Sequence, residues 1–95
     1  MRLSIIVEDG TVVKDQVGYS NLDFSSCGIP VNTWALQWYE TAGEIEHDGR
    51  EQNTPITELP EWANACLAKW QEAEDARIAA EEAAAAEEVA EEPGV

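Results

Sequence analysis

Residues 33–39 read TWALQWY, and this stretch decides the fold of the 95-residue chain. As a β-strand it alternates, so that Trp34, Leu36 and Trp38 share one face. We interpret this face as part of the hydrophobic core, because the chain has only one phenylalanine to fill a core otherwise. An aromatic row could instead bind a sugar or a proline-rich peptide, since tryptophan is frequent at binding hot spots. Tyr39 lies on the opposite face and is a candidate for an exposed contact with a partner.

A hairpin is expected to follow from this strand. Residues 41–43 (Thr-Ala-Gly) suit a turn, and residues 44–47 alternate charged and apolar side chains as a strand does. The alternation places Ile45 toward the core and its acidic neighbours toward water. The pattern over residues 33–48 therefore predicts one antiparallel hairpin.

A second hairpin is predicted near the N-terminus. Asp9-Gly10 separates two β-branched runs, and both residues tolerate the positive φ angles of a tight turn. We expect strands at about 2–8 and 11–15. A short third strand could form at 22–24, so the predicted sheet is mainly antiparallel and has four or five strands.

A long C-terminal helix is predicted from about residue 60 to residue 91. Pro60 suits the first turn of a helix, and alanine and glutamate, which dominate its later part, are strong helix formers. The first half carries a continuous apolar stripe at helical spacing. The stripe consists of Leu59, Trp62, Ala63, Cys66, Leu67 and Trp70. We expect the helix to dock on the sheet by this stripe and to project beyond it.

The distribution of charged residues also changes near residue 71, where the apolar stripe of the predicted helix ends. Residues 1–70 hold 11 acidic and 4 basic side chains, whereas residues 71–92 hold 9 acidic side chains, one basic side chain and nine alanines. We therefore predict an α+β domain over residues 1–70, in which a small antiparallel sheet of two hairpins packs on the first half of the helix. Residues 71–95 are predicted to be an acidic, Ala/Glu-rich helical extension with a frayed end.

The formal charge of −15 argues against two classes of partner. A surface this negative repels phosphate backbones and anionic lipid headgroups, so we expect no binding to nucleic acid or to membranes. The N-terminal stretch reaches Glu8 too early for a signal peptide, and no run of 18 apolar residues could span a membrane. The chain is therefore expected in the cytoplasm.

No motif for catalysis, for a cofactor or for a metal is visible. Cys27 and Cys66 lie 39 residues apart without a CxxC motif, and His47 is the single histidine. We interpret the cysteines as two buried thiols, with a disulfide as the alternative, and a zinc site would need scattered ligands. The sequence predicts a binding or structural protein that is not an enzyme and uses no cofactor.

The helical extension carries most of the candidate partner-binding residues. Its alanines recur at alternating spacings of three and four residues, as in the seam of a coiled coil. This seam consists of Ala76, Ala79, Ala83, Ala86 and Ala90, with Ile78, Ala85 and Val89 on a separate flank. Two parallel copies would bring glutamates together, so a partner helix with a basic or mixed face fits better than a second copy. A solvated spacer without any partner is the alternative.

Five sequence landmarks, IP, ALQWY, GEIE, PIT and LPEW, occur in this order before the alanine-rich helix. They occupy residues 29–30, 35–39, 43–46, 55–57 and 59–62. In this order the chain resembles, over residues 1 to about 75, small proteins encoded near the tail-fibre genes of tailed bacteriophages. The resemblance implies a tail-fibre assembly chaperone or a small fibre- or baseplate-associated virion protein. It also implies a place in the host cytoplasm during assembly or in the virion tail, and it transfers no functional residues.

Two functions follow from these observations. The first is a non-enzymatic assembly protein that binds a fibre or baseplate protein through its sheet or its helix. The C-terminal helix could also form homo- or hetero-oligomers. The alternative is an acidic DNA mimic that inhibits restriction enzymes, suggested by the pairs Glu81-Glu82, Glu87-Glu88 and Glu91-Glu92. Such mimics usually carry acids over the whole folded body, whereas about half lie in the extension here, so the first function is favoured.

Overall fold

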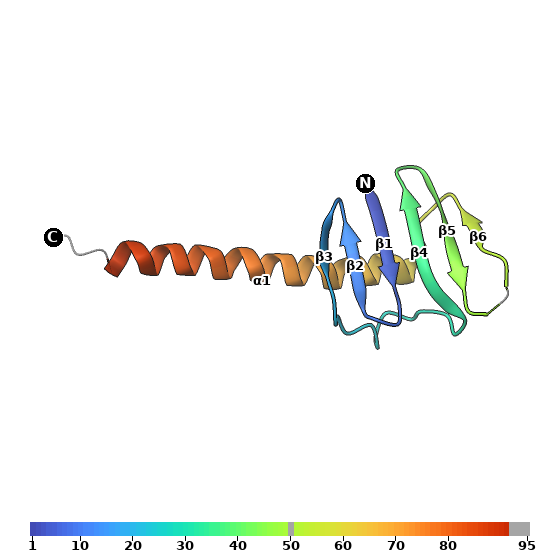
Figure 1. Ribbon diagram of the computed structural model, residues 1–95, viewed down its shortest axis with the longest axis horizontal. Helices are drawn as coiled ribbons and strands as arrows, with labels where there is room; N and C mark the ends of the chain where they lie inside the picture. The colour runs from blue at the N-terminus through green and yellow to red at the C-terminus, as the bar shows by residue number, and fades with distance from the viewer. Residues whose placement is uncertain (50, 92–95) are drawn as a thin grey trace.

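The computed structural model describes residues 1–49 and 51–91, and the side chains of residues 1–49 and 51–86. These residues form six strands and one helix. The elements are β1 (Arg2–Ile6), β2 (Thr11–Lys14), β3 (Val17–Tyr19), β4 (Thr33–Tyr39), β5 (Ala42–His47), β6 (Thr54–Ile56) and α1 (Glu61–Glu91). All strands lie in one antiparallel sheet in the order β3-β2-β1-β4-β5-β6. Figure 1 shows α1 behind the sheet, running from beneath β4 past β3. The predicted α+β class and the long helix are confirmed.

The sheet consists of two three-stranded meanders that join where β1 pairs with β4. Both predicted hairpins are present, as β1–β2 and β4–β5, and each is extended by a short edge strand. The sheet therefore has six strands where the sequence predicted four or five. The third strand lies at 17–19 rather than at 22–24, because Asp15 and Gln16 both have positive φ angles, 48° and 75°, and reverse the chain directly after β2.

The hydrophobic core lies between one face of the sheet and the first half of α1. Alternate residues of the central strands point toward the helix, and the predicted helical stripe points toward the sheet. The fully or largely buried members are Leu3, Ile5, Val12, Leu36, Trp38, Trp62, Ala63, Cys66 and Trp70, with Cys27 from the loop that joins β3 to β4. Leu59 and Leu67 are partly buried against this cluster. The predicted docking of the helix by its stripe is confirmed.

The prediction that Trp34 belongs to the core is wrong. Thr33 pairs with His47 and Ala35 pairs with Glu46, so that Trp34 is an extra residue in β4, a β-bulge. The bulge shifts the alternation by one residue, and Thr33 takes the buried position with 6% exposure. The Trp34 side chain is 43% exposed. The Trp34 carbonyl still accepts a hydrogen bond from Val7 N at 3.0 Å, which anchors the bulge to the end of β1.

Gly43 is required by the close approach of β4 and β5. A Cβ at this position would lie 2.9 Å from Trp38 Cα and closer still to the Gln37 carbonyl oxygen, and backbone atoms cannot move aside cheaply. We expect Gly43→Ala to lower the free energy of unfolding by about 1–3 kcal/mol, the usual cost of overpacking. Urea denaturation followed by circular dichroism measures this loss.

Gly18→Ala in β3 is the matched control for Gly43→Ala. The tightest contact of its Cβ would be with the Val13 side chain, at 3.1 Å from Cγ2, whereas the nearest backbone atom, the Val12 carbonyl oxygen, lies at an ordinary 3.8 Å. Because that side chain can shift, the free energy of unfolding should change by no more than about 0.5 kcal/mol. Equal losses in both variants would contradict the close contact at Gly43.

Candidate interaction surface

The helix is anchored to the edge of the sheet by Trp70. Its indole Nε1 donates a hydrogen bond to the Val17 carbonyl of β3 at 2.8 Å. The Tyr19 ring meets the Trp70 ring edge to face, with centroids 6.0 Å apart. Lys14 Nζ lies 4.9 Å from the centroid of the same ring, in a cation–π contact. One buried tryptophan therefore joins α1 to both β2 and β3.

Two turns later, Arg77 makes the last described contact between α1 and the sheet. Its Nε donates to the Tyr19 hydroxyl at 3.0 Å and to Glu74 Oε1 at 2.8 Å. Arg77 Nη1 also pairs with Glu81 Oε1 at 2.9 Å. Hydrogen bonds with Glu74 and then with Tyr19 raise the pKa of Arg77, so this guanidinium is charged at every accessible pH. We call Tyr19, Trp70, Glu74 and Arg77 the clasp.

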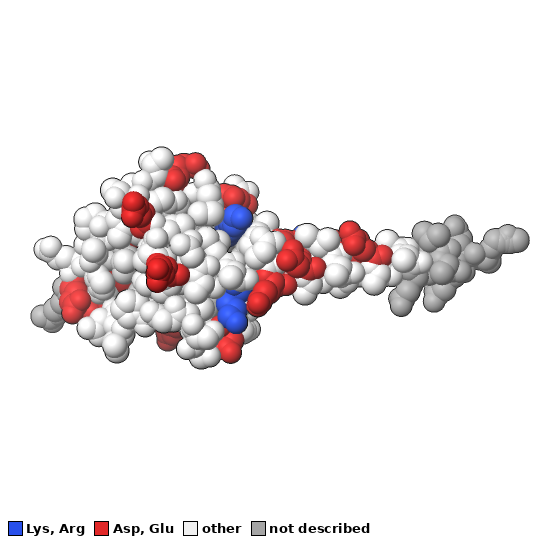
Figure 2. Space-filling model, turned by 180° about the vertical axis from the view of Figure 1, so that it is seen from behind, with Lys and Arg blue, Asp and Glu red and all other residues white. Residues whose placement is uncertain are grey.

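The clasp sets where the helix leaves the body. We call residues 78–91, the part of α1 beyond the clasp, the arm. Every described side chain of the arm, from Ile78 to Ala86, is exposed. Figure 2 shows the arm extending away from the body with carboxylates along it. Fourteen helical residues at a rise of about 1.5 Å make the arm about 20 Å long.

The predicted seam lies on this exposed helix. Ala76, Ala79, Ala83 and Ala86 are all exposed, and Ile78 is 40% exposed as one of the few large apolar side chains open to solvent. Val89 and Ala90 belong to α1, but their side chains lie outside the described residues, as do residues 92–95, where a frayed end was predicted. The seam is thus accessible over its described part.

Tyr39 is on a different surface from the seam. It points away from the helix, on the face of the sheet that α1 does not cover, and is 52% exposed as predicted. The guanidinium carbon of Arg2 lies 4.2 Å from its ring centroid. Arg2 also donates to the Gln37 side chain at 3.0 Å, and Gln37 Nε2 donates to Glu46 Oε2 at 3.2 Å. This open face carries a preformed polar network, and the structure does not bring Tyr39 and the seam together.

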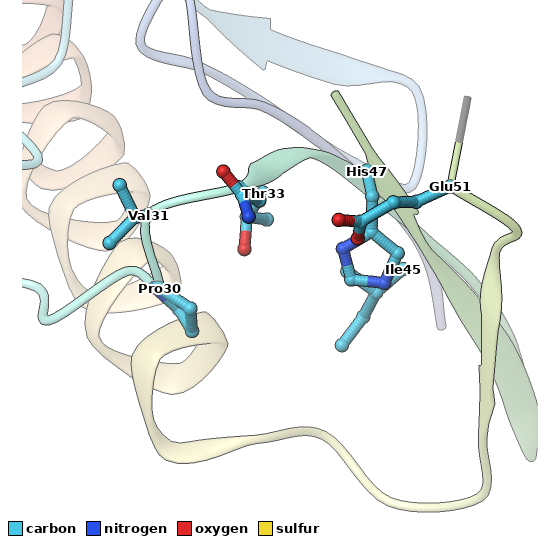
Figure 3. Close-up of a pocket in the computed structure, with 7 residues that line it drawn as sticks. Pro30, Val31, Thr33, Ile45, His47 and Glu51 are labelled. Carbon is cyan, nitrogen blue, oxygen red and sulfur yellow. The ribbon is translucent and has the colours of Figure 1, made fainter. Parts of the chain in front are cut away.

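A hollow that sequence reasoning missed lies at the start of β4. Its volume is about 320 Å³, and it is lined by Pro30, Val31, Asn32, Thr33, Ile45, His47 and Glu51. Figure 3 shows these side chains around the hollow, with the first turn of α1 below it. His47 Nε2 is 2.7 Å from Thr54 Oγ1, which fixes the imidazole at one wall. Val31 is 93% exposed beside this hollow, and nothing in the sequence around Pro30 indicates that exposure.

The residues that a scattered zinc site would have needed do not converge. Cys27 and Cys66 lie in the core as free thiols, whereas His47 lies in the hollow. Within the described residues, no group of three His, Cys, Asp or Glu side chains could hold a metal ion. The predicted interpretation of the cysteines as buried thiols is confirmed.

Three of the four described Lys and Arg side chains contact other side chains of the molecule, whereas most acids of the helix face solvent. Arg2, Lys14 and Arg77 contact Tyr39, Trp70 and the clasp carboxylate respectively. On the arm, Glu81 and Glu82 are exposed. Negative charge is thus displayed on the projecting helix.

Comparison of the chain with protein-family models, with curated protein sequences and with solved structures gave no match. No helix among the described residues is both long and apolar enough to cross a membrane. The fold and its surfaces define a small α+β body with an anchored, acidic helical arm.

Proposed function

We propose that this protein is a non-enzymatic phage tail-fibre assembly chaperone or a small fibre- or baseplate-associated virion protein. It binds a fibre or baseplate protein through its arm and the open face of its sheet. It acts in the host cytoplasm during assembly, and a structural form of the same protein would remain in the virion tail. The observation that carries the proposal is the anchored arm, a helix with every described side chain beyond the clasp exposed. The five sequence landmarks within residues 29–62, through which the chain resembles proteins encoded near phage tail-fibre genes, are the basis for proposing a fibre or baseplate partner.

An exposed helix held at a fixed origin suits recognition of a partner helix or groove. A flexible tail loses conformational entropy when it binds, whereas a helix clasped at Trp70 and Arg77 starts with part of this ordering complete. Small seam residues let a partner backbone approach closely. Because the arm is acidic, we infer that the contacting face of the partner is basic or mixed in charge.

Co-expression with a phage tail-fibre protein tests the proposal. An affinity-tagged copy of the protein should retain the fibre protein through purification, and the yield of fibre trimer should fall when the protein is left out. Failure to co-purify, together with an unchanged trimer yield, would refute the proposal. Mass spectrometry of purified virions separates its two forms, because a chaperone should be absent and a structural subunit should be present at fixed stoichiometry.

The acidic DNA-mimic function is the alternative. Glu81 and Glu82 are exposed on the arm, as a mimic would need. In the body, Glu74 is nine-tenths buried and bound to Arg77, and Glu46 is held by Gln37, so these carboxylates are not displayed like phosphates. Tight, salt-sensitive binding to a restriction enzyme that is lost on deleting residues 71–95 would favour this alternative over the fibre partner.

A further inference from the structure

The loop between β3 and β4 lies against α1 through a pair of cysteines. Cys66 is fully buried on the helical stripe, between Trp62 and Trp70, and Cys27 of the loop is 7% exposed in the same core cluster. Both are free thiols. We propose that Cys27 and Cys66 are a modification site, a thiol pair that a small disulfide such as glutathione disulfide oxidises to an intramolecular cross-link between loop and helix. This inference does not depend on the proposed function.

The loop is held so that Cys27 stays over the helix. At its start, Asn21 N and Leu22 N donate to the carbonyls of Asp9 and Gly10 at 3.0 and 2.9 Å. Cys27 N donates to the Phe24 carbonyl at 3.0 Å, which closes a turn directly before the cysteine. Phe24 and Ile29 are packed against the core on either side of it. The Cys27 side chain therefore enters the core at a defined place.

The two thiols are neighbours. Burial, and after it the nearby Cys27, raise the pKa of the Cys66 thiol to about 12. In the reduced protein Cys66 is therefore a neutral thiol at neutral pH, and its side chain is inaccessible to solvent. Cys27, with its small exposed fraction, is the sulfur that an oxidant in solution meets first.

The chemistry is two successive thiol–disulfide exchanges. The Cys27 sulfur attacks glutathione disulfide, whose S–S bond breaks, so that a mixed disulfide forms and one glutathione leaves as a thiol with the Cys27 proton. The Cys66 thiol then gives up its proton and attacks the Cys27 sulfur as a thiolate, the mixed disulfide breaks, and the second glutathione leaves as a thiol with that proton. The two protein thiols have lost two electrons, and one glutathione disulfide has become two glutathione molecules.

The cross-link closes a loop that contains β4, β5 and β6, because the two cysteines are 39 residues apart. A covalent bond across this span restricts the unfolded chain more than the folded protein. The oxidised form is therefore the more stable one, with its loop tied to the helix one turn before the clasp tryptophan.

The test is to treat the full-length folded protein with glutathione disulfide at neutral pH and to measure its intact mass. We expect a loss of about 2 Da with no change in oligomeric state, and a Cys27–Cys66 peptide in a non-reducing digest. The melting temperature should rise by roughly 10 °C and return on reduction. An unchanged mass, a product that stops with one glutathione attached, a disulfide-linked dimer or a lower melting temperature would overturn the proposal.

Two single variants check the order of the exchanges. Cys66→Ala keeps Cys27 and should stop with one glutathione attached, whereas Cys27→Ala keeps only the buried Cys66 and should stay unmodified. If Cys27→Ala instead takes up glutathione while folded, the assigned entry at Cys27 is wrong. The mass and digest of the unaltered protein decide the proposal if either variant does not fold.

Discussion

A Trp70→Ala variant is expected to lose about 3–5 kcal/mol of unfolding free energy, the usual cost of truncating a buried tryptophan. The indole is 7% exposed and joins α1 to Val17, Tyr19 and Lys14. The loss is a large part of the roughly 5–15 kcal/mol typical of a whole small domain, so the variant should unfold at a clearly lower urea concentration. Urea denaturation followed by far-ultraviolet circular dichroism measures it.

Trp34→Ala is the matched control, since it removes the same side chain from the β-bulge. Because Trp34 is 43% exposed, we expect its unfolding free energy to fall by about 1 kcal/mol or less. A loss as large as that of Trp70→Ala would mean that Trp34 belongs to the core after all. The pair of variants therefore tests both the clasp and the bulge.

Local sequence signals were sufficient for the main elements of the fold. Asp9-Gly10 marks the first hairpin, and the period of two at Leu36 and Trp38 gives their burial correctly. The stripe from Leu59 to Trp70 has the helical period and docks as predicted. In each case a short-range pattern is sufficient, because turn chemistry and burial of one face act within a few residues of the chain.

The features that failed or were missed depend on contacts between distant residues. The bulge at Trp34 depends on the pairing of Thr33 with His47, and the identity of neither residue predicts this pairing. The turn at Asp15 and Gln16 lacks glycine, so β3 was not expected at 17–19. The clasp between Tyr19 and Arg77 joins residues 58 positions apart, and no periodicity in either segment indicates it. Of the candidate site residues with described side chains, only the exposure could be predicted. For Tyr39 it follows from the alternation of its strand, and for the residues of α1 it follows from their polar surroundings on the helix.

If the protein has the proposed function, the double variant Ala79→Gln/Ala83→Gln should lower its affinity for the fibre protein by about tenfold or more, which is about 1.4 kcal/mol of binding free energy. Both alanines are exposed seam residues, so the free protein should fold unchanged. Glutamine adds bulk where the seam would allow a partner helix to approach closely, and shape mismatch at such a contact costs affinity. Titration of the tagged variant against purified fibre protein gives the change in affinity.

Ala80→Gln/Ala84→Gln provides the control, because it makes the same substitutions one residue later in each case. These alanines are also exposed, but each lies about 100° further round the helix, outside the seam. Charge, composition and helix propensity are identical in the two double variants, so only the altered face differs. Capture that survives in the control and fails in the seam variant assigns the contact to the seam. Equal loss in both would indicate a partner that surrounds the arm, and equal retention would move the contact to the open face, where Tyr39→Ala should then reduce capture.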